Sequence, residues 1–268
     1  MNDAVSCGAC CGLYNCAGAS REQLRCLLAT RTEQFAGVLR SADAIDDFRI
    51  RMERREHGER PYIDFYACPF LGFLGPRRLR PGCLLHPLAD GNEGIDYRGL
   101  SFYGGLACRD YFCPSTRNLP SGHKTIVKTV CADWYLYGLV ITEEQLLAAI
   151  FAGIETRLGR PLAPAEVAER RPARDALAEL FGLKLSWPHR GQDWKGPANY
   201  FFNDGLYPRA PIDYGRINAQ PSVHDRILRE LGSSFASRRE LIAAETLIET
   251  RIDRVLRALA SAAADTGH

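Results

Sequence analysis

The chain has 268 residues, of which 46% are hydrophobic, enough to fill the core of one large domain or two smaller ones. Its 34 lysines and arginines against 32 aspartates and glutamates leave a net charge of +2, which argues against a nucleic-acid partner. No apolar run approaches the roughly 20 residues of a membrane span and the first residues show no secretory signal, so we expect a cytoplasmic protein with no membrane partner. In a reducing cytoplasm the ten cysteines are expected to be metal ligands or redox groups rather than a disulfide framework.

Eight of the ten cysteines lie in two regions rich in glycine or proline. Four fall within the stretch CGACCGLYNC, namely Cys7, Cys10, Cys11 and Cys16. Four return later, namely Cys68 in ACPFLG, Cys83 in PGCLLHP, and the pair Cys108 and Cys113 in ACRDYFCPS. The other two, Cys26 and Cys131, stand alone in helical patterns and are expected to be ordinary buried apolar residues. Because loops of this kind are hard to hold together by packing alone, we expect the two regions to close on one another around a metal or an iron–sulfur cluster.

Two amphipathic helices are expected after the first cysteine region. Ser20 is a suitable N-cap, and apolar residues recur at helical spacing from there to about Arg40. A second helical pattern runs from about Ser41 into Arg55. From residue 61 to about residue 120 glycine and proline recur every few residues, which predicts loops and short strands, with a small hairpin at residues 95–103.

Beyond residue 120 the pattern is helical again. Helices are expected at residues 124–140, from an N-cap at Thr142 to a stop at Gly159, and at residues 163–181, 223–231 and 237–260. An aromatic segment at residues 187–214 either covers the helical core or lines a pocket, and residues 264–268 are expected to fray. The predicted fold class is therefore mainly α with minor β. It combines a small, irregular, loop-rich cysteine module with N-terminal helices at residues 1–120 and a helical domain packed on it at residues 121–268.

The spacing of the cysteines indicates metal binding. Cys7-x-x-Cys10 places two sulfurs on one tight turn, and Cys108-x4-Cys113 offers a second pair, so the two pairs suffice for one tetrahedral zinc site. The remaining four cysteines leave sulfur for a second metal or for an iron–sulfur cluster with four cysteine ligands, expected as [4Fe–4S]. Thiolates suit zinc and iron ions alike, so the ligand type leaves both open. The adjacent side chains of Cys10 and Cys11 diverge, so these two serve different centres or one of them is not a ligand.

The ordered motifs CGACC, CPFL, CLLHP and CRDYFCP resemble the YkgJ-type cysteine-cluster family, which is described as zinc- or iron-chelating and as iron–sulfur-cluster-containing. The resemblance covers roughly residues 4–115. It implies a ligand set made of Cys7, Cys10, Cys11, Cys68, Cys83, Cys108 and Cys113.

Two departures from the family pattern bear on this ligand set. Ala4 stands where the fuller signature has another cysteine, and Cys16 is the candidate replacement. After Cys83 the chain continues with His86 and a long insertion up to Cys108, where the family has a tyrosine and an Arg-Pro before a nearby Cys-Arg. One branch resembling this family methylates flagellin lysines, although the sequence shows no glycine-rich loop for S-adenosylmethionine.

Three further groups accompany the cysteines. Arg109, next to Cys108, is predicted to support the cofactor by offsetting its negative charge and donating hydrogen bonds to sulfur. His86 is a nitrogen ligand, a proton donor beside the centre, or an exposed loop residue. The basic run GPRRLRP at residues 75–81 either holds an anionic substrate, lowers neighbouring thiol pKa values, or is a solvated loop.

The function expected from these features is that of a cytoplasmic metal-binding protein. Its centre would transfer electrons, as in an oxidoreductase, or support a protein modification such as lysine N-methylation. The alternative is a non-catalytic, zinc-stabilised protein-interaction module. An electron donor or a protein partner of unknown identity is implied, and no catalytic residue is assigned.

Overall fold

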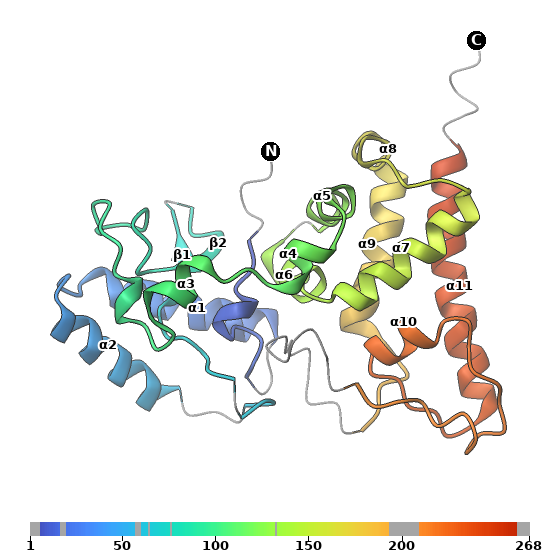
Figure 1. Ribbon diagram of the computed structural model, residues 1–268, viewed down its shortest axis with the longest axis horizontal. Coiled ribbons are helices and arrows are strands. Elements are labelled where there is room, and N and C mark those ends of the chain that lie inside the picture. The colour runs from blue at the N-terminus through green and yellow to red at the C-terminus, as the bar shows by residue number, and fades with distance from the viewer. Residues whose placement is uncertain are drawn as a thin grey trace, which may run out of the picture. The chain divides into compact units, whose positions relative to one another are not determined.

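The computed structural model describes residues 6–16, 20–56, 60–63, 65–75, 77–131, 133–192 and 209–261. The chain is mainly helical, and within these ranges the only sheet has two strands, so the predicted fold class is confirmed (Figure 1). The chain divides into two compact units. Unit 1 comprises Met1–Cys113, Asp133–Leu139 and Lys195–Asp204, and unit 2 comprises Pro114–Ala132, Val140–Trp194 and Gly205–His268. Most of the predicted aromatic segment and the last seven residues lie outside the described ranges.

Unit 1 begins with the two predicted helices, α1 (Arg21–Ala36) and α2 (Ala42–Arg55). Ser20 caps α1 through a capping box in which its side chain accepts a hydrogen bond from the Gln23 N–H and the Gln23 side chain accepts one from the Ser20 N–H. Ser41 caps α2 by accepting a hydrogen bond from the Ala44 N–H. The sequence patterns therefore predicted the starts of both helices correctly.

An aromatic core in unit 1 contacts three of the predicted ligand cysteines. The rings of Phe35, Phe48 and Phe70 pack with centroids 5.0–6.1 Å apart. Cys68 is buried in this cluster, and Cys11 and Cys83 pack against it. Packing around these rings therefore fixes the backbone that carries the three sulfurs.

A β-hairpin carries the third cysteine segment. Strands β1 (Leu71–Leu74) and β2 (Arg80–Cys83) pair antiparallel with Leu71 opposite Cys83, and α1 lies against β1 (Figure 1). The hairpin predicted at residues 95–103 was wrong. That stretch instead forms the short 3-10 helix η2 (Arg98–Leu100), because the Asp96 carboxylate accepts the Arg98 N–H and the Tyr97 N–H bonds back to the Leu85 carbonyl. The remaining helix of this region is α3 (Gly104–Asp110).

Unit 2 is helical within its described residues. Its helices are α4 (Pro114–Asn118), α5 (Ser121–Val130), α7 (Glu144–Leu158), α8 (Pro164–Glu169), α9 (Arg171–Ser186), α10 (Asp225–Glu230) and α11 (Arg238–Ala260). α7 and α9 both pack against α11, as Figure 1 shows. Their facing sides bury aliphatic residues such as Ile154, Leu177 and Ile248. Gly159, at φ +67, ends α7 where the sequence predicted a stop.

Two helices predicted as continuous are broken. The stretch 124–140 divides into α5 and α6 (Trp134–Ile141), because the Asp133 carboxylate accepts the N–H groups of Tyr135 and Leu136 and starts a new helix. The stretch 163–181 divides into α8 and α9 at Arg170. Pro172 lies in the first turn of α9, where its missing N–H costs nothing.

A buried group of charges stabilises unit 2. Glu143, rather than the predicted Thr142, is the N-cap residue of α7, and its fully buried carboxylate pairs with the fully buried Lys184. Arg209 contacts both Glu143 (3.0 Å) and Glu230 (3.3 Å). Burial lowers the pKa of Lys184 to about 8. Burial alone would raise the pKa of Glu143, but the two cations outweigh it and lower that pKa.

Among the described helices, none is by itself both long and apolar enough to cross a membrane. One consecutive pair, Trp134–Ile141 and Glu144–Leu158, meets the criterion only when the two are taken together across a sharp bend.

Candidate metal centre

The first cysteine segment packs against the loops of residues 61–85, as the sequence predicted. The Cys68 N–H donates to the Cys11 carbonyl at 2.8 Å, which joins two cysteine segments through the backbone. Asn15 is fully buried, and its side-chain NH₂ donates to the carbonyls of Tyr62 (2.8 Å) and Phe65 (2.6 Å). Its side-chain oxygen accepts the Tyr62 N–H at 2.9 Å. A buried amide that makes all three bonds holds this segment in one position.

Close backbone contact makes glycine necessary beside Cys11. Gly12 has φ +78, and a Cβ at this residue would lie 2.5 Å from the Tyr66 carbonyl oxygen and 2.6 Å from the Ala67 Cα. Both atoms belong to the backbone and cannot rotate away. Gly12 therefore permits the contact that brings Cys10 and Cys11 to the Cys68 segment.

Seven of the eight predicted ligand cysteines form one electrostatic network. They are Cys7, Cys10, Cys11, Cys68, Cys83, Cys108 and Cys113. Cys11 lies at the middle: a hydrogen bond with Cys10, burial, and the neighbouring Cys68 and Cys83 thiols raise its pKa. The Cys10 pKa is lowered, first by the same hydrogen bond, so the two adjacent side chains meet, and the expectation that they diverge was wrong. The gathered residues come from four segments that are far apart in the sequence.

The other cysteines of the network also act on one another electrostatically. Cys7 is affected by Cys10 and by Cys113, and burial is the largest cause of its raised pKa. Burial also raises the pKa of Cys68 to about 12 and that of Cys83 to about 11, and the Cys108 thiol adds to both shifts. Thiols crowded in this way resist ionisation, and only a bound cation would offset the cost of several thiolates together.

Backbone N–H groups point at four of these sulfurs. At Cys10 they are its own N–H and that of Cys11, and at the other three they come from residues further along the chain. The Ala9 N–H donates to the Cys7 sulfur at 3.3 Å, and the Phe70 N–H donates to the Cys68 sulfur. The Cys83 sulfur accepts the N–H groups of Leu85 and His86. In all three cases a donor lies two residues after the cysteine. Hydrogen bonds to sulfur favour the thiolate and tune the properties of sulfur-ligated metal centres.

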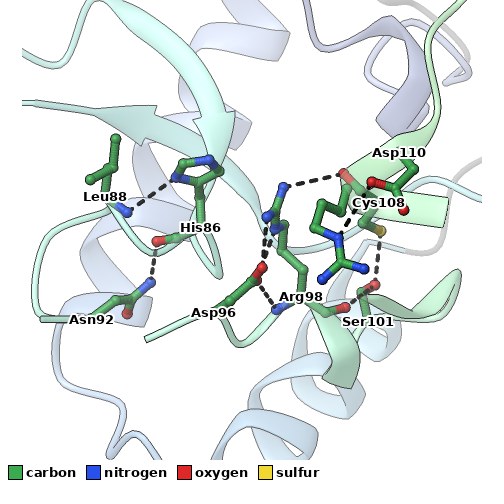
Figure 2. Close-up of polar contacts among 9 residues, drawn as sticks. His86, Leu88, Asn92, Asp96, Arg98, Ser101, Cys108 and Asp110 are labelled. Atoms are coloured by element: carbon green, nitrogen blue, oxygen red, sulfur yellow. Dashed lines mark hydrogen bonds and ion pairs between the residues drawn. The ribbon is translucent and has the colours of Figure 1, made fainter. Parts of the chain in front are cut away.

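Two guanidinium groups reach the network, those of Arg98 and Arg31. The buried Arg31 donates to the Cys68 carbonyl at 3.0 Å, and its charge opposes the rise in the Cys68 pKa. Burial and the neighbouring thiols raise the pKa of Cys83, and the Arg98 charge opposes that rise. Figure 2 shows Arg98 held by the Asp96 carboxylate at 2.6 Å, with its other amino group 3.5 Å from the Cys108 carbonyl. The hydroxyl of Ser101 lies 3.0 Å from the Cys108 sulfur. Sequence reasoning missed Arg98 and Ser101. The Asp-x-Arg spacing signalled the ion pair, but nothing placed it beside the cysteines.

Arg109 occupies a different environment from the one that its sequence position suggested. Its side chain is 54% exposed, and its Nε lies 3.4 Å from the carboxylate of Asp110. The described contact of Arg109 is therefore with a neighbouring carboxylate and not with a cysteine sulfur. Its support of a metal centre remains a prediction from the sequence.

Cys16 and Cys26 make their described contacts outside the network. The Cys16 thiol donates to the Leu13 carbonyl; burial raises its pKa, and the charges that act on it are those of Arg31, which lowers the pKa, and Glu56, which raises it. Cys131 is buried, as predicted. The prediction that Cys26 is buried was wrong, because this residue is exposed on α1 and donates to the Glu22 carboxylate.

His86 is oriented as a hydrogen-bond donor. Its Nδ1 accepts the Leu88 N–H at 3.1 Å (Figure 2), so the neutral ring carries its hydrogen on Nε2. Neither nitrogen then has a free lone pair for a metal. In this arrangement His86 serves as a hydrogen-bond donor and not as a ligand.

The donor set fits a thiophilic cofactor in its chemistry. Sulfur ligands select zinc and iron–sulfur clusters, and N–H donors already point at four of the sulfurs. In the part of the chain that the structure describes, no group of three His, Cys, Asp or Glu side chains is arranged to hold a metal ion. The network thus gathers the sulfurs in one region without closing them around one point.

The chain was compared with protein-family models, with curated proteins and with solved structures, and none of the three comparisons found a match. The resemblance to the YkgJ-type family therefore stays an expectation drawn from the cysteine motifs.

Proposed function

We propose that unit 1 binds a cysteine-ligated metal centre, with an iron–sulfur cluster as the first assignment, and that the protein transfers electrons in the cytoplasm. The ligands are drawn from the seven networked cysteines. This number exceeds the four sulfurs of a single structural zinc site and suffices for a four-cysteine cluster.

One contrast among the cysteines carries this proposal. Cys7, Cys68 and Cys83 accept backbone N–H bonds, which favour the thiolate state that a metal ligand needs. Cys16 and Cys26 instead donate their thiol hydrogens to oxygen atoms, which favours the protonated state. Cys7, Cys68 and Cys83 belong to the network, whereas Cys16 and Cys26 lie outside it.

Metal analysis of protein purified without oxygen tests the proposal. We expect bound iron, acid-labile sulfide and broad visible absorption, and we expect Cys68→Ser and Cys83→Ser to lose most of that absorption together with stability. Cys26→Ser is the matched control, since its thiol lies on the surface of α1, and it should keep its full metal content. Wild-type protein that is folded, colourless and free of iron and zinc would contradict the proposal.

A second candidate is a zinc-stabilised protein-interaction module without catalytic activity. The segment around Cys108 favours it, because α3 buries none of its residues and apolar side chains there face the solvent. Phe102 is 66% exposed and Leu106 is 73% exposed. A colourless protein with stoichiometric zinc and unchanged behaviour toward reductants would support this candidate over the first.

The sequence resemblance also implies support of a protein modification such as lysine N-methylation. Transfer of a methyl group from S-adenosylmethionine to a lysine peptide, measured with the iron-loaded protein, separates this role from electron transfer. We expect reversible reduction of the centre without methyl transfer. Methyl transfer that depends on Cys83 would overturn the assignment as an electron carrier.

A further inference from the structure

A cavity of about 300 Å³ lies on the β1–β2 hairpin beside the cysteine network. Its apolar lining is formed by Leu74, Pro81 and Leu88, and Cys83 also lines the cavity. This volume is at the lower end of the range for small-molecule sites, so it suits a ligand of a few carbon atoms. Its polar lining includes Ser6, Arg80 and His86.

Arg80 supplies a guanidinium that is free to bind a ligand. Its side chain is exposed at the start of β2, and it has no ion-pair partner among the described residues. Arg78, two residues earlier, is instead paired with Glu33 at 3.3 Å. Two arginines of the basic run therefore differ in their surroundings. Arg78 forms an ion pair within the protein, whereas Arg80 lines the cavity.

His86 supplies a neutral hydrogen-bond donor. Its Nδ1 is occupied by the Leu88 N–H at 3.1 Å, so the ring hydrogen is on Nε2, for which the described residues provide no acceptor. The Ser6 hydroxyl donates to the Pro81 carbonyl at 2.7 Å and so holds Ser6 against β2 at the cavity. Arg80 is near enough for its charge to act on His86, and a guanidinium and an imidazole N–H lining one cavity match the two oxygens of a carboxylate.

The charges around the cavity favour an anion. None of its lining residues is acidic, and the nearest described carboxylate that affects His86, Asp96, is already paired with Arg98 at 2.6 Å. We propose that the cavity binds a small organic carboxylate, held by Arg80 and the His86 Nε2–H, with its apolar body against Leu74 and Leu88. Because Cys83 lines the same cavity, the ligand would lie beside the proposed centre.

Nuclear magnetic resonance with the full ¹⁵N-labelled chain tests this site. Butanoate is the probe, butanamide is the uncharged control of the same size, and inorganic phosphate tests for a simple oxyanion site. We expect saturable shifts at Gly82 and His86 with butanoate, with butanamide and phosphate each binding at least about tenfold more weakly. Arg80→Gln should weaken butanoate binding by about tenfold or more. Arg77→Gln, which removes an exposed neighbouring guanidinium outside the cavity lining, should change it less than about twofold.

Equal binding of butanoate and butanamide, or unchanged affinity in Arg80→Gln, would overturn the proposal. Phosphate that binds more tightly than butanoate would overturn the carboxylate class. A long-range ¹H–¹⁵N spectrum showing the His86 hydrogen on Nδ1 would remove the assigned donor. The two proposals can fail separately. Protein that contains no metal when purified without oxygen, yet binds butanoate, upholds the cavity and contradicts the proposed centre; protein that contains the metal but does not bind butanoate upholds the centre and contradicts the cavity.

Discussion

Replacing Gly12 by alanine tests whether close backbone contact holds the first cysteine segment against the Cys68 segment. The left-handed φ of +78 would cost an alanine about 1–2 kcal/mol. Its Cβ would overlap the Tyr66 carbonyl oxygen at 2.5 Å, and overpacking against rigid atoms costs about 1–3 kcal/mol. The smaller entropy of the unfolded alanine chain returns about 0.4–1 kcal/mol. The net expectation is a loss of about 3 kcal/mol in the stability of this contact.

Hydrogen exchange at the Cys68 amide measures that loss where it occurs, because this N–H donates to the Cys11 carbonyl at 2.8 Å. A loss of 3 kcal/mol corresponds to about a hundredfold faster exchange. Gly37→Ala is the matched control, since Gly37 has φ −91 and open space around the added Cβ. If Gly12→Ala behaved like this control, with unchanged Cys68 protection, the reasoning from backbone contact would be refuted.

Three further predictions concern other parts of the chain. Lys184→Met should destabilise unit 2 by about 3 kcal/mol because it leaves a buried carboxylate one cation short. The pKa of Lys184 is about 8 in the folded chain and about 10.5 when unfolded, so the unfolded chain binds more protons between these values. The wild-type stability should therefore rise relative to Lys184→Met from pH 8 to pH 10.5, measured by urea unfolding, and a constant difference would contradict the burial argument. Gly138→Ala places a Cβ 2.0 Å from the Tyr14 hydroxyl and should cost about 1–3 kcal/mol in thermal unfolding; an unchanged melting temperature would show that Tyr14 can move aside. Arg98→Gln should raise the pKa of Asp96 from about 2 toward its ordinary value, read from its carboxyl carbon shift; an unchanged titration would exclude Arg98 as the cause.

The sequence predicted the regular elements best where local chemistry decides them. The serine caps at Ser20 and Ser41 and the stop at Gly159 are one-residue signals with a direct backbone cause, and the structure has all three. The breaks at Asp133 and Arg170 were missed because apolar spacing continues through them. An aspartate side chain in one case and a proline in the other restart the helix.

The sequence indicated which cysteines gather in the site better than it indicated which of them contact one another. Ordered cysteine motifs identified the thiols that the fold gathers, but long-range packing decides which of them contact one another. Cys16 is close in sequence to Cys11, yet it donates to a carbonyl and takes its electrostatic environment from Arg31 and Glu56. Arg98 could not be placed beside Cys83 from the sequence, because η2 forms where a hairpin was expected.

Site-resolved alkylation of protein purified without oxygen, before and after metal removal, tests the central claim most directly. We predict that the seven networked cysteines are protected in the metal-bound protein and become reactive together when the metal is removed, whereas Cys26 reacts equally in both states. Cysteines of the network that react at the same rates with and without metal would contradict a shared metal centre.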